Sequence, residues 1–182
     1  LLIQDNNKGA SVYENSFFNE LGIFQTNQSI NDEIELLKSI TLLQRVVKDL
    51  SLYVNYYVEG NIKTEEIYGS SLPIKVVVSD LKPQSFAKTL RVQIKDKNTF
   101  ILNDEETETS HEFGQKIVMP YATFTITATP GFADNGYNEV LVKFKDYRRV
   151  ANYYSSALSI YPISKETKVI AINLADPVPE KG

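Results

Sequence analysis

The most regular hydrophobic pattern of the chain lies between residues 31 and 50, where apolar side chains recur every three or four positions. The residues on this face are Leu36, Ile40, Leu43, Val47 and Leu50. This spacing is typical of an amphipathic helix that docks on a core. Ser39 and Thr41 compete for backbone hydrogen bonds in the middle of the segment, so we expect a bend that divides it into two short helices.

Beyond residue 72 the period of the pattern changes to two, which indicates strands. Leu90, Val92 and Ile94 alternate with polar residues, and a turn at residues 96–98 leads to the apolar segment 100–102. We expect these two segments to form a hairpin. Further alternation at residues 121–128 and 140–144 makes residues 72–145 a β-rich, sandwich-like section.

The last part of the chain predicts a second helix and two strands. Asp146 is a good helix cap, and the apolar spacing that follows indicates a helix over residues 146–158. Strands are expected at Ser159–Ile163 and Lys168–Leu174. Because the second of these is apolar on both sides, we expect it to be central and to lie beside a strand at Leu1–Gln4.

These elements predict an α+β fold, a mixed β-sheet covered by helices at about 31–50 and 146–158. A short helix is also expected at Glu14–Leu21. A chain of 182 residues suits one domain over residues 1–182. It has no initiator Met and no apolar run of the roughly 20 residues that cross a bilayer, so we expect a fragment of a longer protein.

Composition excludes several kinds of chemistry. The net charge is −4 and the basic residues are scattered singly, which argues against nucleic acid as a partner. The absence of cysteine excludes disulfides and thiolate sites. His111, the single histidine, stands in a polar segment and is interpreted as solvated surface, as is the acidic turn Asn103–Glu106. We therefore expect no catalytic, cofactor-binding or metal-binding residues, and no enzymatic activity in this chain.

Eleven tyrosines raise the question of carbohydrate binding, because sugar rings stack on aromatic faces. The clustered ones are Tyr53, Tyr56, Tyr57, Tyr153 and Tyr154. Tyrosine is also a common residue of strands and of half-buried helices, and the chain has no tryptophan. A carbohydrate-binding β-rich module of a cell-envelope protein thus remains an alternative interpretation.

Several segments resemble one known family. They are EIELLKS, VVKDLSL, YYVEG and IYGSSLPIKV in the first half, with LLIQDNNKG and SIYPISKETKVIAINLADPVPEKG at the ends. Together they resemble the periplasmic region of chain-length determinant proteins, the polysaccharide co-polymerases of Gram-negative bacteria, in the branch joined to a cytoplasmic tyrosine autokinase. Residues 79–138 match only loosely. The position after LLKS, commonly basic in this family, is Ile40 here.

The resemblance implies a non-catalytic periplasmic scaffold of an inner-membrane protein that regulates the chain length and export of capsular polysaccharide or exopolysaccharide. Its implied partners are further copies of itself in a ring, a polysaccharide polymerase and the nascent polysaccharide, with membrane anchors and the tyrosine kinase domain outside this chain. Mixed charges on the flank of the first helix suit contacts between protomers. The candidate protomer-contact residues are Glu35, Lys38, Arg45, Lys48 and Asp49.

Overall fold

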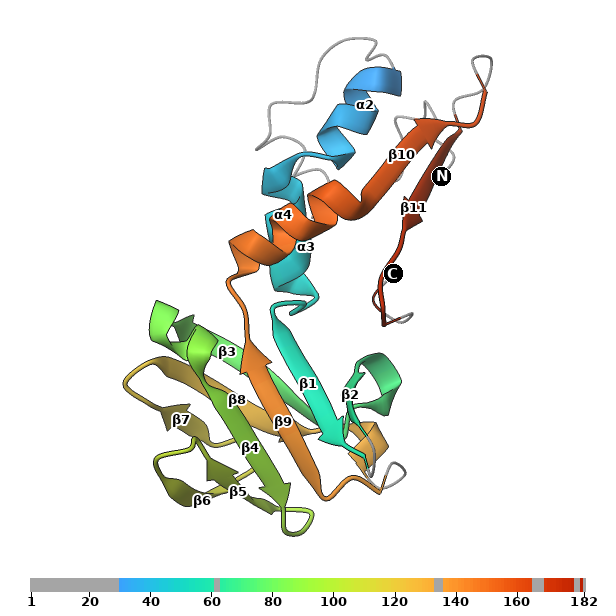
Figure 1. Ribbon diagram of the computed structural model, residues 1–182. Helices are drawn as coiled ribbons and strands as arrows, with labels where there is room; N and C mark the ends of the chain where they lie inside the picture. The colour runs from blue at the N-terminus through green and yellow to red at the C-terminus, as the bar shows by residue number, and fades with distance from the viewer. Residues whose placement is uncertain (1–29, 61–62, 133–135, 165–168, 179–180, 182) are drawn as a thin grey trace, which may run out of the picture.

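The computed structural model describes most of the chain beyond residue 29 (Figure 1). The described residues are 30–60, 63–132, 136–164, 169–178 and 181. The strand expected at Leu1–Gln4 and the helix expected at Glu14–Leu21 lie outside them.

The first amphipathic segment forms two helices, α2 (Ile30–Leu37) and α3 (Ile40–Asp49). Ser39 separates them with an extended backbone at φ −60° and ψ 134°, and its side chain accepts a hydrogen bond of 3.3 Å from the Leu42 backbone N–H. Because this N-cap satisfies a backbone donor that has no partner within the helix, α3 begins anew at this position. The expected bend is confirmed, and a continuous helix over residues 31–50 is not observed.

Two antiparallel sheets contain nine of the eleven strands of the described residues. The larger sheet has six strands in the order β2-β1-β9-β4-β5-β6. Its strands span Thr64–Ile67 (β2), Val54–Glu59 (β1), Glu139–Phe144 (β9), Thr89–Ile94 (β4), Thr99–Asn103 (β5) and Glu108–Glu112 (β6). The smaller sheet has the order β3-β8-β7, with strands Ile74–Leu81 (β3), Ala122–Ala128 (β8) and Lys116–Val118 (β7). Short 3-10 turns occur at Gly69–Ser71, Pro83–Ala87 and Pro130–Phe132.

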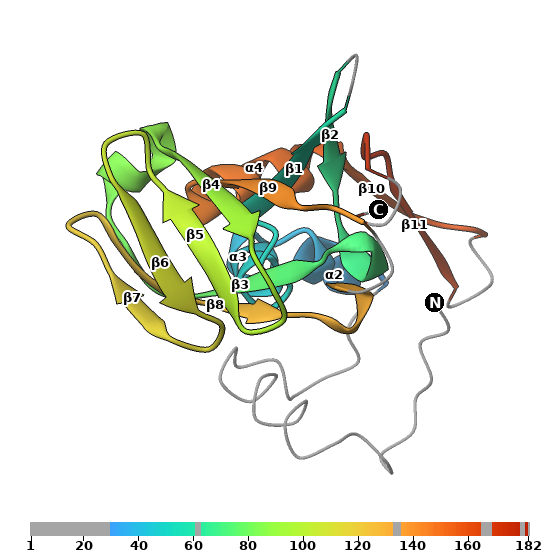
Figure 2. The same cartoon turned by 90° about the horizontal axis from the view of Figure 1, so that it is seen from below.

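The two sheets enclose one hydrophobic core, as the view in Figure 2 indicates. Phe144 of the larger sheet and Phe124 of the smaller sheet meet with ring centroids 5.9 Å apart. The hydroxyl of Tyr56 accepts a 2.8 Å hydrogen bond from the backbone N–H of Val76, which links β1 to β3. Burial raises the pKa of Tyr56 to about 12, so this phenol stays neutral at physiological pH.

A second, smaller core holds α3 against α4 (Tyr147–Ala157). Its buried members are Leu43, Val47, Leu52, Ala151 and Tyr154. Asp146 caps α4 by accepting a 2.9 Å hydrogen bond from the Arg148 backbone N–H, as the sequence predicted. Figure 1 shows that the helices stand beyond one end of strands β1 and β9, so they do not cover a face of the sheet.

An antiparallel ribbon follows α4, formed by β10 (Leu158–Pro162) and β11 (Ile170–Leu174). Ile160 and Ile170 of this ribbon pack on Ile34 of α2 and form a third apolar cluster. The expected strands at the C-terminal end are thus present. Among the described residues β11 pairs only with β10, so its expected central position is not observed there.

The predicted fold class, a mixed sheet covered by helices, is wrong. The sheets of the described residues are antiparallel, and α2, α3 and α4 contain only 8, 10 and 11 residues. The physical reason is that the apolar faces of the two sheets bury each other, which leaves neither inner face for a helix. The β-rich section expected at 72–145 provides seven of the nine strands of these two sheets.

The expected hairpin is present at β4 and β5, where Val92 lies opposite Leu102. Asp96 closes the turn, because its Oδ1 atom accepts hydrogen bonds of 2.7 and 2.8 Å from the backbone N–H groups of Asn98 and Thr99. Local alternation and turn chemistry thus predicted this element correctly.

Leu43→Ala should lower the free energy of unfolding by about 2–4 kcal/mol, because it opens a cavity between α3 and α4. Leu50→Ala, at the C-cap of the same helix, is the matched control. Leu43 is 9% exposed, whereas Leu50 is 56% exposed. For the control we expect a change of about 0.5 kcal/mol or less. Chemical denaturation of both variants checks this, and equal losses would contradict the observed orientation of α3.

Candidate functional site

A pocket of about 460 Å³ lies at the junction between the larger sheet and α4. We call it the junction pocket. The polar and aromatic residues that line it come from β1, β2, the start and middle of α4, and the segment after β11. They are Asn55, Glu66, Lys145, Asp146, Arg149, Tyr153, Tyr154, Asp176 and Lys181.

The buried part of the junction pocket, its floor, is built around the carboxylate of Glu66. Its Oε1 atom accepts hydrogen bonds from the Asn55 side-chain amide and from the ammonium group of Lys181. The Lys181 side chain is only 5% exposed, and its Nζ atom stands 5.5 Å from the centroid of the Tyr68 ring. The ion pair therefore fastens the segment after β11 onto β2.

Asn55, which bonds to Glu66, has a second side-chain atom without a partner. The residue is 2% exposed, and its Oδ1 atom has no hydrogen-bond partner among the described residues. Exchanging the oxygen and nitrogen of the amide would turn Oδ1 toward the Glu66 carboxylate, which is unfavourable because both are acceptors. The amide orientation is therefore fixed, and Oδ1 remains a buried acceptor without a donor among the described residues.

Tyr154 and Asp176 form a second buried contact in the pocket wall. The Tyr154 hydroxyl donates a 2.9 Å hydrogen bond to Asp176 Oδ2, and Asp176 Oδ1 accepts a 2.8 Å hydrogen bond from the Val178 backbone N–H. Burial and the bond to this carboxylate raise the pKa of Tyr154. The neighbouring ring of Tyr153 meets Tyr154 edge-on with centroids 5.4 Å apart, and it is 52% exposed.

The exposed rim of the junction pocket carries cationic groups. Lys145 and Arg149 are exposed, and neither side chain has an ion-pair partner among the described residues. Asp146 between them is engaged as the N-cap of α4. Lys145 and Asp146 also border a second pocket of about 490 Å³, where Lys48 Nζ stands 4.0 Å from the centroid of the Tyr147 ring.

The candidate protomer-contact residues lie along α2 and α3. Glu35 is exposed on α2, and Lys38 is half-buried at the break between the helices. On α3, Arg45 Nε and Asp49 Oδ2 are 3.7 Å apart, and Lys48 lies over Tyr147. Among these five residues, only Lys48 borders a pocket described here, and none lines the junction pocket.

The hydrophobic pattern assigned too many residues to the buried face of this segment. Ile40 and Leu50 are exposed, because α3 restarts after Ser39 and centres its buried side on Leu43 and Val47. Leu50 is already the C-cap of the helix. The exposed side of α3 therefore combines apolar and charged groups, a feature that the periodicity alone did not reveal.

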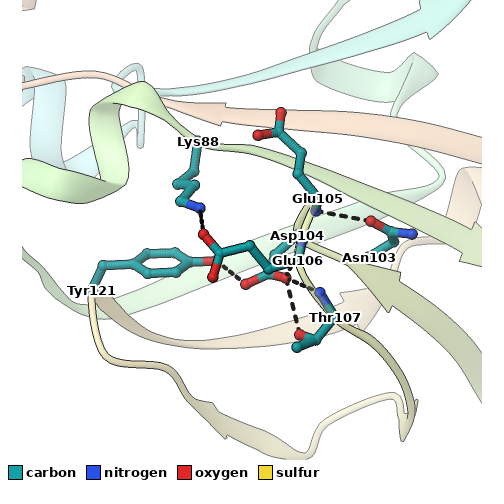
Figure 3. A network of polar contacts seen from close by, with 7 residues as sticks. All are labelled: Lys88, Asn103, Asp104, Glu105, Glu106, Thr107 and Tyr121. Carbon is teal, nitrogen blue, oxygen red and sulfur yellow. Dashed lines mark hydrogen bonds and ion pairs between the residues drawn. The ribbon is translucent and has the colours of Figure 1, made fainter.

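The acidic turn is only in part the solvated surface that the sequence suggested, because Glu105 and Glu106 are exposed and Asp104 is buried (Figure 3). Asp104 is 6% exposed. It accepts hydrogen bonds from the Thr107 backbone and hydroxyl at 2.8 and 2.9 Å, from the Glu106 backbone at 3.3 Å, and from the buried Tyr121 hydroxyl at 2.9 Å. Glu106 also pairs with Lys88. The turn is thus a structural hub that joins β5 to the residue preceding β8.

Hydrogen bonds determine the ionisation of Asp104. Burial alone would raise its pKa, but the bonds from Thr107, Tyr121 and Glu106 outweigh burial and hold the pKa below its usual value. Burial, together with the bond to Asp104, raises the pKa of the Tyr121 hydroxyl. The carboxylate therefore stays ionised and the phenol stays a donor over the physiological range.

His111 lies half-buried on β6. Its Nε2 atom is 2.8 Å from Thr109 Oγ1, its Nδ1 atom is 3.3 Å from Gln115 Oε1, and its ring centroid is 5.8 Å from that of Phe100. Within the described part of the chain, no three histidine, aspartate or glutamate side chains gather in a way that would hold a metal ion. None of the helices described is both long and apolar enough to cross a membrane.

Comparison with known proteins assigns no family. No family model matches the chain, and no curated protein matches it. A crystal structure of FlgL from Xanthomonas campestris aligns over 78% of this chain and 68% of that chain, with 11% sequence identity and a TM-score of 0.27. A likeness this weak supports no statement about fold or function.

Asp104→Ala should lower the free energy of unfolding by about 1–3 kcal/mol, because the buried Tyr121 hydroxyl loses its acceptor. The effect should depend on pH. Since the folded-state pKa lies below the unfolded value of about 3.9, the contribution is fully present above that value and is lost as the pH falls through the folded-state pKa.

Denaturation of the wild type and of Asp104→Ala at several pH values measures this difference. The exposed neighbour Glu105 provides the control, Glu105→Ala, for which we expect a change of about 0.5 kcal/mol or less. A difference between Asp104→Ala and wild type that grows as the pH falls below 4 would contradict the assignment.

Proposed function

We propose that this chain is a non-catalytic periplasmic scaffold of an inner-membrane polysaccharide co-polymerase. In this role it regulates the chain length and export of capsular polysaccharide or exopolysaccharide through contacts between neighbouring copies. The resemblance of residues 33–76 and of both chain ends to chain-length determinant proteins supports the proposal. The polymerase and the nascent polysaccharide are the proposed partners, and the membrane anchors belong to the longer protein.

The observation that carries the proposal is the exposed side of α3. Val46 and Leu50 are large apolar residues that are 37% and 56% exposed, and they neighbour the Arg45–Asp49 ion pair. Exposed aliphatic groups bordered by charges suit a protein–protein contact better than a purely solvated surface. Packing against α4 holds this face in a fixed orientation.

A contact of this size is weak between isolated domains. Exposed ion pairs contribute about 0–1 kcal/mol each, and the two aliphatic side chains add only a small apolar area. In the longer protein, anchors in a common membrane confine the copies and raise their effective concentration. We therefore expect the isolated chain to be monomeric at micromolar concentration and to associate only at about millimolar concentration.

Leu50→Glu should abolish this concentration-dependent association, because it places a charge in an apolar contact. Sedimentation velocity and NMR relaxation over a concentration series measure the association of the wild type and the variant. Val118→Glu on β7 is the matched control, since Val118 is 72% exposed and lies in the smaller sheet, away from α3.

Two outcomes would contradict the proposed contact. A wild type that stays monomeric at millimolar concentration, or a Leu50→Glu variant that associates as the wild type does, would remove α3 as the interface. A stable ring-sized particle at micromolar concentration would mean that a stronger interface lies elsewhere in the chain.

Carbohydrate binding, the alternative function, would be favoured by an exposed aromatic cleft within residues 72–145, the β-rich section. Two exposed aromatic residues line the junction pocket: Phe86 lies within that section, and Tyr153 on α4 lies outside it.

A further inference from the structure

We infer that Lys181 and Asn55 are the two reactants of an intramolecular isopeptide bond, with Glu66 as the catalytic group that moves the protons. The bond joins Lys181 Nζ to Asn55 Cγ and releases ammonia. The inference goes beyond the scaffold function, because it concerns a covalent link within one copy of the chain and requires no association between copies.

The three side chains meet around one atom. The amide Nδ2 of Asn55 and the ammonium of Lys181 both donate to Glu66 Oε1. Glu66 lies opposite Tyr57 in the pairing of β1 with β2, so it is a diagonal neighbour of Asn55 on the same face of the sheet. The Lys181 backbone N–H donates a 2.9 Å hydrogen bond to the carbonyl of the buried Val178. The amine is thus held beside the amide that it attacks, which is the main requirement for a reaction between two weakly reactive groups.

The surroundings of the three groups favour their neutral forms. Asn55 and the Lys181 side chain are buried, Glu66 is half-buried, and the ring of Tyr68 lies 5.5 Å from Lys181 Nζ. Because water is largely excluded, the ion pair has lost much of its solvation. This loss lowers the cost of moving one proton from Nζ to Glu66, which leaves an amine with a free lone pair beside a carboxylic acid.

The unpaired acceptor of Asn55 fits this neutral state. While Glu66 is ionised, the amide must donate to it, and Oδ1 has no partner among the described residues. Once Glu66 carries the proton, its O–H is a donor, and half a turn of the amide pairs it with Oδ1. A hydrogen bond at Oδ1 draws electrons from Cγ, the atom that the amine attacks. The acceptor that is unsatisfied in the ionised state is therefore satisfied in the reactive state.

The reaction requires no other reagent. Nζ adds to Cγ, and the electron pair of the C=O bond moves to Oδ1. Glu66 gives its proton to Nδ2 and takes one from Nζ, which is general acid–base catalysis. The C=O bond then re-forms, and ammonia leaves with the electrons of the Cγ–Nδ2 bond and takes the remaining proton from Glu66. An ammonium and a primary amide thus become a secondary amide and an ammonium ion, which leaves through the junction pocket that all three residues line.

The bond would make permanent what the ion pair does in the described structure, namely hold the segment after β11 on the larger sheet. It closes a loop between residues 55 and 181, and such a cross-link stabilises a fold mainly by restricting the unfolded chain. The chain contains no cysteine, so no disulfide provides this constraint.

Intact-mass spectrometry of the purified wild-type chain tests the inference directly. We expect a mass about 17 Da below that of the sequence, because one ammonia is lost. Proteolysis should yield a branched peptide in which residues 55 and 181 are joined. Folded protein that keeps the full sequence mass after prolonged incubation at neutral pH would overturn the inference.

Two variants test the assigned roles. Lys181→Arg keeps a cation beside Glu66 but replaces the amine with a guanidinium that does not act as a nucleophile. Glu66→Gln keeps the size of the side chain but accepts no proton. Both variants should retain the full mass of their sequences. Lys97→Arg makes the same exchange in the exposed β4–β5 turn, and this control should lose about 17 Da as the wild type does.

The variants also exclude another source of ammonia loss. Asn135 precedes Gly136, and such a pair loses ammonia when the asparagine cyclises onto the next backbone nitrogen. A loss that persists in Lys181→Arg would arise elsewhere and would refute the proposed bond. If a variant does not fold, the presence or absence of the branched wild-type peptide decides the question. Leu50→Glu should form the bond normally, so that the two proposals fail independently.

Discussion

The arrangement of the described structure depends on the burial of one face of β9 between the two sheets. β9 lies between β1 and β4 in the larger sheet, and Val140, Val142 and Phe144 point into the shared core with at most 1% exposure. Phe144 contacts Phe124 of the smaller sheet and also lines the junction pocket. Because β9 is fixed by pairing on both edges and by packing on one face, the chain leaves the sheet at a defined position.

That position determines where the helices stand. Only Lys145 and Asp146 separate β9 from α4, and Asp146 is already the N-cap of the helix. α4 in turn provides Ala151 and Tyr154, against which Leu43 and Val47 of α3 pack. The position of β9 therefore sets the orientation of the exposed side of α3 and of the wall of the junction pocket, although neither belongs to the sheet.

The sequence correctly predicted the features that depend on interactions between neighbouring residues. The Ser39 bend, the Asp146 cap and the β4–β5 hairpin each depend on residues within a few positions of one another, and each was predicted correctly. The helix-covered sheet was wrong, because alternation shows that a strand has an apolar face and does not show whether a helix or a second sheet covers it. Asp104 was misread for a related reason: its partner Tyr121 lies 17 residues away, so a polar segment was mistaken for a solvated one.

The junction pocket could not be predicted from the sequence, because its floor joins residues that lie far apart in the chain. Lys181 reaches Glu66 across 115 residues, and no spacing or motif relates the two. The desolvation of such a buried pair offsets much of its attraction, so its contribution to stability is limited. Its geometric effect is larger: with the Tyr154–Asp176 bond, it holds the segment after β11 against β2 and α4. The pocket is therefore defined by where this segment is held.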